Sequence, residues 1–485
     1  MRACKCAMDW TVRIDAMNAA TSRLDHHPRL RAPIRAQMCR NTHGVWIGML
    51  AALVTSSSLF PMNARAETTW IEAECAARLS EASPRDEATQ DGSSLSIDLA
   101  EVRRRVIAGS PALAADCEVI SERTAQVVQA GVRPNPEIEV ELEEFAGTGD
   151  LAGVDAAEVT LMARQVIETA GKREKRRRVA LTARELALVD YQIDRAELLG
   201  AAEVAFVGVL AAQSRIELQS EIIRAARASV ESTARLVAAG AASPVESIRA
   251  DVELAAAEVE RASGAHALAA ARARLAATWA GATDELGRAE GSLPEPARIE
   301  SGEPESSIDA SPRLARLSLE IDRRRAVVAL EDSRATPDVT VAAGLRRLEE
   351  LDDTAFVAAV SVPLPSFDRN QGERAAARAR VRSARHERAA MLAHLTAERA
   401  RLAAERETRA NEAIQLRDRI LPNAERAFEG VRRGYAQGRF RSLDVIEARR
   451  RLFELRLREI DALSAHATLG AELRRLVAVA PGTGE

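Results

Sequence analysis

The chain has 485 residues, of which 29% are charged and only 3% are aromatic, and its formal net charge at pH 7 is −4. Ala, Arg, Glu and Leu recur through most of the length, as they do in long helices and coiled coils, so the composition argues against a thick globular core. The small net charge, with Arg and Glu interspersed, marks no surface for nucleic acid or for an acidic substrate.

The first 66 residues are predicted to be a leader that carries a signal peptide. An apolar run at Val45–Leu59 follows basic residues and precedes Ala64–Ala66, an A-x-A cleavage site, so the mature chain is expected to begin at about Glu67. Translation could start at Met38. The alternative, a membrane anchor, needs about 20 apolar residues. No later stretch is expected to cross a membrane as a helix, and a membrane part would therefore have to be a closed β-barrel.

Few residues beyond the leader are candidates for chemistry. Segment 67–95 is predicted to be a polar N-terminal lead-in, and Cys75 within it could pair with Cys117 in an oxidising periplasm, which the sequence leaves open. The four later histidines are isolated, without a second ligand at i+3 or i+4. Gly171-Lys172 lacks the rest of a phosphate-binding loop, and a catalytic triad is missing. We expect no cofactor, no metal site and no enzymatic activity.

The remainder of the chain consists of two copies of one sequence repeat. Ser110-Pro111 returns as Ser311-Pro312, and Gly240 returns as Gly438, each about 200 residues later. An internal repeat of this kind predicts two copies of one fold. The predicted boundaries are a first repeat at 96–281, a linker at 282–308, a second repeat at 309–480 and a C-terminal tail at 481–485.

Each copy contains two predicted strands. The first strand, Asn135–Phe145, alternates aliphatic residues with the glutamates Glu137, Glu139, Glu141 and Glu143. A period of two marks a strand with one apolar and one wet face, and the glutamates are candidate lumenal carboxylates of a barrel. Strands of about 10 residues span a bilayer when tilted. The other strands are expected at Glu158–Ile167, Asp338–Arg347 and Thr354–Leu364.

A very long helix follows each strand pair, at about Lys172–Ala239 and Glu373–Gln437. At 1.5 Å per residue, some 65 residues reach roughly 100 Å. Shorter helices return at about Val245–Ala280 and Leu443–Val479. Their missing length is expected from the helices that precede the strands, stacked end to end, at about Ala100–Ala130 and Asp309–Arg334. The predicted fold class is therefore mainly α with a small β part.

Four strands per chain cannot close a barrel, and open strand edges are not tolerated in lipid. About eight strands make the smallest membrane barrels. We therefore expect a homotrimer whose twelve transmembrane strands close one β-barrel, with the long helical hairpins forming a helical barrel around the same three-fold axis.

Several segments of the chain resemble the TolC-like outer-membrane efflux proteins, and within them the branch that serves cobalt-zinc-cadmium metal efflux. The resemblance covers about residues 96–480. PLPSFDRNQG is specific to that branch, whereas LDVIEARR is typical of the whole family. The most specific parts are RPNPEIEVELEEF (133–145), QVIETAGKREKR (165–176), PDVTVAAG (337–344), VSVPLPSFDRNQGERA (360–375) and YAQGRFRSLDVIEARRRLFELR (435–456).

The resemblance implies a trimer with a twelve-stranded barrel in the outer-membrane lipid and a helical tunnel through the periplasm. It also implies docking to a periplasmic adaptor protein and to an inner-membrane pump of the proton-driven RND type. The aromatic residues near the strands are few, namely Phe145, Phe356 and Phe367, so the interfacial girdle of such a barrel is expected to be sparse.

In the family, the turns far from the membrane form the periplasmic mouth, and acidic residues just inside it ring the constriction. The match places Asp444 and Glu447 there, three residues apart and so on one helix face, with Glu246 of the first repeat as a weaker member. Three-fold symmetry would gather the carboxylates of Asp444 and Glu447 in a ring that attracts cations. The alternative is an ordinary exposed helix start, where acids also favour the helix dipole.

Other residues at the mouth have candidate roles from the same resemblance. Tyr435 and Arg439 or Arg441 occupy the approach to the turn, where family members hold the mouth shut, although a tyrosine there is also a common packing residue. Glycine in these turns is needed for positive φ whatever the function. The residues expected to meet the adaptor belong to the two turns and are Gly240, Ser243 and Gly438.

We predict a passive outer-membrane conduit that extends into the periplasm and carries divalent heavy-metal cations, while the inner-membrane partner supplies the energy. One alternative is a periplasmic coiled-coil adaptor or scaffold that never enters lipid, which would explain the helices but not the alternating strands. Another is a channel of the same family that exports drugs or proteins, since specificity would lie in the pump.

Overall fold

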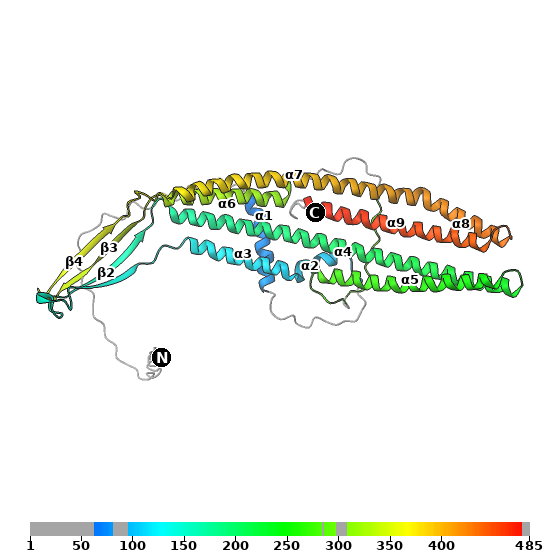
Figure 1. The fold of residues 1–485 in the computed structure, drawn as a ribbon, viewed down its shortest axis with the longest axis horizontal. Helices are drawn as coiled ribbons and strands as arrows, with labels where there is room; N and C mark the ends of the chain where they lie inside the picture. Colours follow the sequence, from blue (N-terminus) through cyan, green and yellow to red (C-terminus); the bar gives the residue numbers. More distant parts are fainter. Residues whose placement is uncertain (1–62, 81–95, 284–285, 297–307, 478–485) are drawn as a thin grey trace, which may run out of the picture. The chain divides into compact units, whose positions relative to one another are not determined.

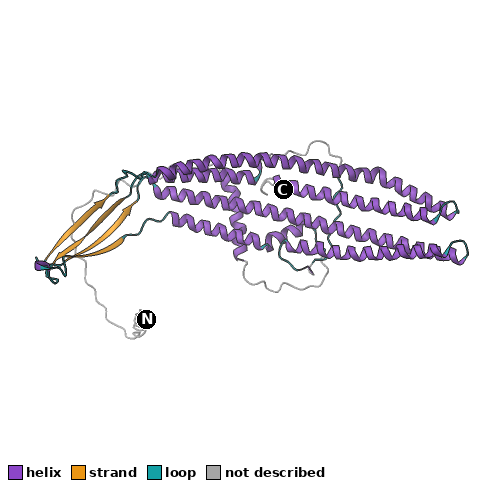
Figure 2. Ribbon diagram, viewed as in Figure 1, coloured by secondary structure: helices purple, strands orange, loops and turns teal. Residues whose placement is uncertain are grey.

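The computed structural model describes residues 63–80, 96–283, 286–296 and 308–477. Most of the predicted leader, with its signal peptide, and the C-terminal tail lie outside these residues. Figure 2 shows that the described part is mainly helical, and its strands form a single four-stranded sheet. The predicted fold class, mainly α with a small β part, is confirmed.

The elements follow the same order in the two halves of the chain, as the internal repeat predicted. The first half contains α2 (Leu99–Gly109), α3 (Pro111–Ala130), β1 (Glu137–Glu143), η1 (Gly149–Leu151), β2 (Glu158–Ile167), α4 (Lys172–Ala238) and α5 (Pro244–Ala277). The second half contains η3 (Ile308–Ala310), α6 (Pro312–Arg334), β3 (Val339–Leu348), β4 (Asp353–Ser361), α7 (Gln371–Gln415), η4 (Leu416–Ile420), α8 (Leu421–Ala436) and α9 (Ser442–Val477).

Two predicted helices are interrupted at prolines. Pro111 divides the helix expected at about Ala100–Ala130, where the prediction of one helix was wrong, and Pro422 interrupts the second long helix, as the proline in the sequence indicates. Ser110 is extended, with φ −69° and ψ 118°, because Pro111 lacks the N–H that would continue α2 and instead starts α3. The second long helix contains a π-turn, η4, directly before Pro422. A π-turn shifts the backbone hydrogen bonds by one residue, and this shift accommodates a residue that cannot donate.

The shorter helices stack end to end along the long ones, as predicted (Figure 1). α3 and α5 both pack against α4, and α6 and α9 both pack against α7. At one joint, Ser311 Oγ donates to the carbonyl oxygen of Leu476 at 3.3 Å. At the other, Gly109 of α2 lies against Trp279, which follows α5. The segment predicted as a linker also contributes to an apolar core, because its residue Leu286 is buried in a cluster of apolar side chains from several elements.

One described helix, α4, is long and apolar enough by composition to cross a membrane, contrary to the expectation from the sequence. Its apolar residues include Phe206, Val207 and Leu210, which are buried in a core shared with α2, α5 and α9. Length and composition are weak evidence for a membrane span, and packing between helices accounts for the apolar character of this stretch.

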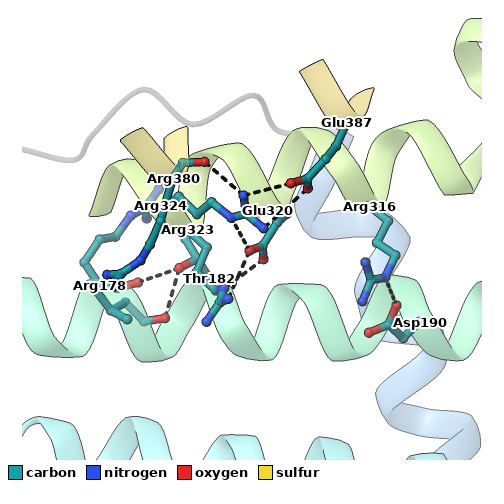
Figure 3. A network of polar contacts seen from close by, with 10 residues as sticks. Arg178, Thr182, Asp190, Arg316, Glu320, Arg323, Arg324, Arg380 and Glu387 are labelled. Carbon is teal, nitrogen blue, oxygen red and sulfur yellow. Dashed lines mark hydrogen bonds and ion pairs between the residues drawn. The ribbon is translucent and has the colours of Figure 1, made fainter. Parts of the chain in front are cut away.

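Linked arginine–carboxylate pairs hold α6 between α4 and α7 (Figure 3). Arg316 of α6 pairs with Asp190 of α4. Arg324 donates to Glu320 on its own helix at 2.7 Å and also reaches Glu387 of α7 at 3.4 Å. An isolated surface pair contributes little to stability, but linked pairs contribute more. Here the linked pairs join α6 to α7, and the separate pair of Arg316 with Asp190 joins α6 to α4.

The segment predicted as a polar lead-in contains a packed helix, α1 (Asn63–Ser80). Cys75 of α1 forms a disulfide with Cys117 of α3, which decides the pairing that the sequence left open. Tyr191 of α4 is fully buried in the same apolar cluster, and its hydroxyl donates to Glu74 of α1 at 2.5 Å. α1 is therefore covalently attached to α3 and held on α4 by a hydrogen bond and apolar packing.

A group of carboxylates lies where α3 meets α4. Burial raises the pKa of Asp116 to about 6, and the charges of Asp194 and Asp190 add to the shift. A carboxyl group whose pKa is higher in the folded than in the unfolded chain stabilises the fold as the pH falls, because the folded state takes up the proton first. Above about pH 6, the charged Asp116 therefore opposes folding.

Asp116→Asn is expected to raise the free energy of unfolding at pH 7.5 by about 1–2 kcal/mol, allowing for solvent screening of a partly exposed group. The gain should shrink as the pH falls from about 6 toward 4, where Asp116 itself becomes protonated. Thermal unfolding midpoints of the purified protein across this pH range measure the effect.

Asp332→Asn is the matched control and should lower the midpoint at pH 7.5. Hydrogen bonds from Arg374 and Arg378 lower the pKa of Asp332, so its charged form stabilises the fold. Equal midpoints for the wild type and Asp116→Asn at pH 7.5 would contradict the assignment of Asp116.

Candidate functional site

The four strands form one antiparallel sheet in the order β1-β2-β3-β4, so β1 and β4 are its edges within the chain. Val140 lies opposite Leu161, Leu161 opposite Leu345, and Leu345 opposite Phe356. Residues paired in an antiparallel sheet share a face. A row of aliphatic and aromatic side chains therefore crosses one face of all four strands.

This face, the apolar face of the sheet, carries no charged side chain in β1–β4 except Arg347 beside the β3–β4 turn. Most of its large residues are exposed in the single chain, such as Leu345 at 45% and Phe356 at 92%, whereas Val159, Val339 and Val341 are partly buried. Extended exposed apolar patches mark contact with a membrane or a partner. The apolar face is suited to lipid.

The opposite, acidic face carries the four predicted lumenal glutamates of β1: Glu137, Glu139, Glu141 and Glu143. Glu139 pairs with Arg164 of β2. Arg346 of β3 lies 2.6 Å from Glu158 and 3.3 Å from Glu143. Sequence reasoning missed both arginines, because the register between strands was unknown. Acids still outnumber bases on this face, so it is suited to water and to cations.

The strands meet the long helices in a polar junction. Lys172 at the start of α4 is buried, and its Nζ lies 2.7 Å from Asp338 Oδ1, directly before β3. The same carboxylate accepts from the backbone N–H of Thr169 at 2.8 Å. Gly171 before α4 and Asn370 before α7 both adopt the left-handed conformation, in which Gly and Asn are favoured. Gly171-Lys172 thus joins strand to helix.

The two helical hairpins end in turns of the same geometry. Gly240 and Gly438 have φ of 71° and 72°. The Gly240 N–H bonds to the Val237 carbonyl oxygen at 3.0 Å, and the Gly438 N–H bonds to that of Tyr435 at 2.9 Å. The following residue in each turn bonds back five positions, which completes a Schellman helix end. The two glycines therefore have equivalent positions.

Two of the predicted mouth residues complete the starts of the return helices. Ser243 Oγ accepts from the Val245 N–H at 3.3 Å at the start of α5. Asp444 Oδ2 accepts from the Arg441 N–H at 2.8 Å at the start of α9, as in one half of a capping box. Both satisfy N–H groups that a helix start leaves without partners. Asp444 therefore stabilises its turn whatever its charge also does.

Glu447 lies one turn further along α9 and is exposed. It lines a cleft of about 330 Å³ between α5 and α9, with Ile248 and Leu443 among the apolar walls. Arg450 pairs with Glu253 of α5 at 2.7 Å across this cleft. Glu447 therefore has a different environment from that of Asp444, although both lie near the start of α9.

The remaining predicted residues come from both hairpins. Burial raises the pKa of Tyr435 in α8, and the nearby charge of Glu246 in α5 adds to the shift. The structure thus places these two predicted residues within electrostatic range of each other. Arg439 and Arg441 are exposed in the turn, and neither has an acidic partner in the described part of the chain.

Sequence reasoning missed the arginines that tie the second hairpin to the first. Arg449 is buried, and its Nη1 donates to the Ala225 carbonyl oxygen of α4 at 3.3 Å. Arg456 lies 2.9 Å from both Glu221 of α4 and Glu425 of α8. In the sequence these residues belong to an arginine-rich stretch that is typical of a solvated helix face. Only the register between helices distinguishes them.

A sheet with one face for lipid and one acidic face, joined to helices of roughly 100 Å, defines a membrane channel subunit with a long helical extension. The family model described as outer membrane efflux protein matches the chain twice, over residues 102–281 and 304–479. The chain belongs to this family. It is an outer-membrane efflux channel subunit that extends into the periplasm, and this favours the channel over the periplasmic scaffold.

Particular relatives agree with this family. The chain is 33% identical over 352 residues to the cobalt-zinc-cadmium resistance protein CzcC of Cupriavidus metallidurans, which covers 72% of this chain and 82% of that protein. The crystal structure of CusC shares the fold with a TM-score of 0.65 and 15% identity, covering 78% of this chain and 91% of CusC. The outer membrane protein VceC of Vibrio cholerae has a TM-score of 0.64 and 16% identity, covering 79% and 96%. The resemblance recognised in the sequence is confirmed.

A test of the mouth must remove charge without removing the helix cap. Asp444→Asn combined with Glu447→Gln removes both charges and keeps an acceptor for the Arg441 N–H. In planar bilayers this double variant is expected to weaken block by multivalent cations from the periplasmic side by at least about tenfold, as for a loss of roughly 1.4 kcal/mol of attraction.

Glu137→Gln combined with Glu139→Gln is the matched control on the barrel face. It should change block less, because a wider and more hydrated passage weakens the field of each carboxylate. Unchanged block in the mouth variant, with block abolished in the barrel variant, would place the constriction in the barrel and contradict the assignment of the mouth.

Proposed function

We propose that this chain is one of three identical subunits of the outer-membrane channel through which a tripartite pump expels divalent metal cations. The observation that carries the proposal is the sheet: its apolar face is suited to lipid, while β1 and β4 remain unpaired edges within the chain. Unpaired edges are not tolerated in lipid, and four strands cannot close. Three copies supply twelve strands, and the acidic faces then line one lumen.

The turns at the ends of the helical hairpins are proposed to form the periplasmic mouth and to dock an adaptor protein. Val245, Phe440 and Leu443 beside these turns are large apolar residues that are about half exposed. Apolar side chains at the centre of a polar rim are typical of protein interfaces. An inner-membrane RND-type pump would supply the energy, and the channel itself would be passive.

The gate is proposed to involve the residues that the two hairpins bring together. Tyr435 and Glu246 come from different repeats and lie within electrostatic range of each other, and Asp444 and Glu447 follow on α9. Three copies of these acids around the axis would concentrate cations at the entrance. Arg439 and Arg441, which are exposed in the turn, are available for contacts with a neighbouring copy.

Two observations support divalent metal cations as the transported substrate, namely the charge of the acidic face and the name of a relative. The acidic face carries more acids than bases, and negatively charged passages favour cations. The relative of 33% identity is, by its name, a cobalt-zinc-cadmium resistance protein. The metal ion is proposed as the substrate of transport. Among the described residues, no group of three or more His, Cys, Asp or Glu side chains could hold one.

Deletion of the gene is expected to lower the tolerance of the cells to zinc, cadmium or cobalt severalfold, because cations would no longer leave the periplasm. Growth inhibition and cell-associated metal, measured by elemental mass spectrometry, report the effect. Complementation with the wild-type gene is the control. Unchanged metal tolerance together with altered antibiotic tolerance would contradict the metal assignment and move the cargo to drugs.

A further inference from the structure

We propose that the strand-to-helix junction of the first repeat binds an anionic glycerophospholipid of the periplasmic leaflet, with Arg133 and Arg173 holding the headgroup phosphate. The proposal rests on the outer-membrane location of the channel and does not depend on its cargo. It assigns a ligand to basic residues that neither the strand pairing nor the helix packing uses.

A cavity of about 510 Å³ lies where the chain enters β1 and where it passes from β2 into α4. Arg133 and Arg173 both line this cavity, and both are exposed. Neither has an acidic partner in the described part of the chain, whereas the nearby Arg176 is paired with Glu168. Two guanidinium groups at one cavity suit a phosphate, which each can bind in a bidentate manner.

Two of the other charged residues of the cavity, Lys172 and Glu168, are already engaged in ion pairs. Lys172 is buried and held by Asp338 at 2.7 Å, so its ammonium group stabilises the junction and is not a headgroup ligand. Glu168 is bound by Arg176, whereas Glu174 is exposed and lies 3.9 Å from Arg177, at the limit of an ion pair. The arginine pair therefore provides the charge available to a ligand.

The cavity borders the apolar face of the sheet. Ile167 at the end of β2 lies on that face by register, and it lines the cavity while remaining 49% exposed. Ile138 at the start of β1 is on the same face and is 70% exposed. An acyl chain along this face would place its phosphate beside Arg133 and Arg173. A free phosphate would use the arginines alone, whereas a phospholipid uses both surfaces.

The same border continues at the other edge of the sheet. Leu364 and Phe367 follow β4 and are 83% and 94% exposed, and Arg369 comes two residues after Phe367, beyond Asp368. Aromatic and basic residues together are typical of the level where a bilayer meets water. In a closed barrel, β4 of one copy lies beside β1 of the next, so Phe367 of a neighbour would approach this cavity.

The test uses the delipidated full-length protein in detergent and native mass spectrometry. Phosphatidylglycerol is compared with phosphatidylethanolamine of the same acyl chains, so that only the headgroup charge differs. The wild type is expected to prefer phosphatidylglycerol and to lose it as salt is raised. Arg133→Gln combined with Arg173→Gln should weaken this binding on the order of tenfold, as for two basic side chains near a lipid surface.

Arg261→Gln is the matched control, since Arg261 is an exposed arginine of α5 far along the chain from the junction. It should bind phosphatidylglycerol as the wild type does, and the spectra report in each case whether the oligomer is intact. Glycerol 3-phosphate separates a lipid site from a phosphate site, because it carries the headgroup phosphate without acyl chains. It is expected not to displace the lipid at equal concentration.

Three results would overturn the proposal. They are equal binding of the two lipids by the wild type, unchanged binding in the double variant, and displacement by glycerol 3-phosphate at equal concentration. The salt dependence of the wild type reports the contribution of headgroup charge, and the double variant reports whether Arg133 and Arg173 provide it. The metal tolerance of cells that carry the double variant is measured separately. If the variant loses the lipid but the cells keep their metal tolerance, the metal-efflux function remains supported independently of the lipid site.

Discussion

β1 and β4 each have one edge whose backbone N–H and C=O groups have no strand partner within the chain, and these unpaired groups constrain the whole molecule. One face of the sheet is free of charge up to the β3–β4 turn and carries exposed side chains such as Phe356 and Val360, so it belongs in lipid. In lipid each unpaired backbone group costs several kcal/mol. The edges must therefore pair with other chains, and the acidic face then turns toward a shared lumen.

The helices extend away from the membrane around the same passage, and they have only a small apolar core. A wall of helices around a passage has water on both sides, so apolar packing is confined to narrow seams between neighbours. The low aromatic content of 3% fits such a wall. Ion pairs between helices, such as Arg316 with Asp190 and Arg456 with Glu221, join the seams that apolar side chains do not fill. The ion pair between the buried Lys172 and Asp338 fixes the start of α4 beside the start of β3.

Features with a local cause were predictable from the sequence. The alternation of Ile138 and Val140 with glutamates predicted the two faces of β1, because the period of a strand is a property of neighbouring residues. The repeat predicted that Gly240 and Gly438 end equivalent hairpins, and both have positive φ. The length of α4 followed from an unbroken run without proline.

Features that depend on how elements meet could not be predicted in this way. Arg346 reaches Glu158 only because β2 and β3 have a particular register. Arg450 pairs with Glu253 only because α5 and α9 lie side by side. The polar composition of segment 67–95 concealed α1, whose disulfide requires an approach of α1 to α3 that no sequence spacing specifies. At the proposed mouth, the family resemblance pointed to the charge of Asp444 but did not reveal that its carboxylate completes a helix start.

The two faces of β1 allow the most direct measurement. Val140 and Glu141 are adjacent, and they lie on opposite faces of the sheet. Lysine at position 140 would enter lipid at a cost of about 2–4 kcal/mol per copy near the bilayer centre, whereas lysine at position 141 would face water. The amount of detergent-resistant oligomer in outer-membrane fractions is compared for Val140→Lys and Glu141→Lys. The account predicts loss of the oligomer with Val140→Lys and near wild-type amounts with Glu141→Lys. Equal amounts for the two variants, or loss with Glu141→Lys alone, would contradict it.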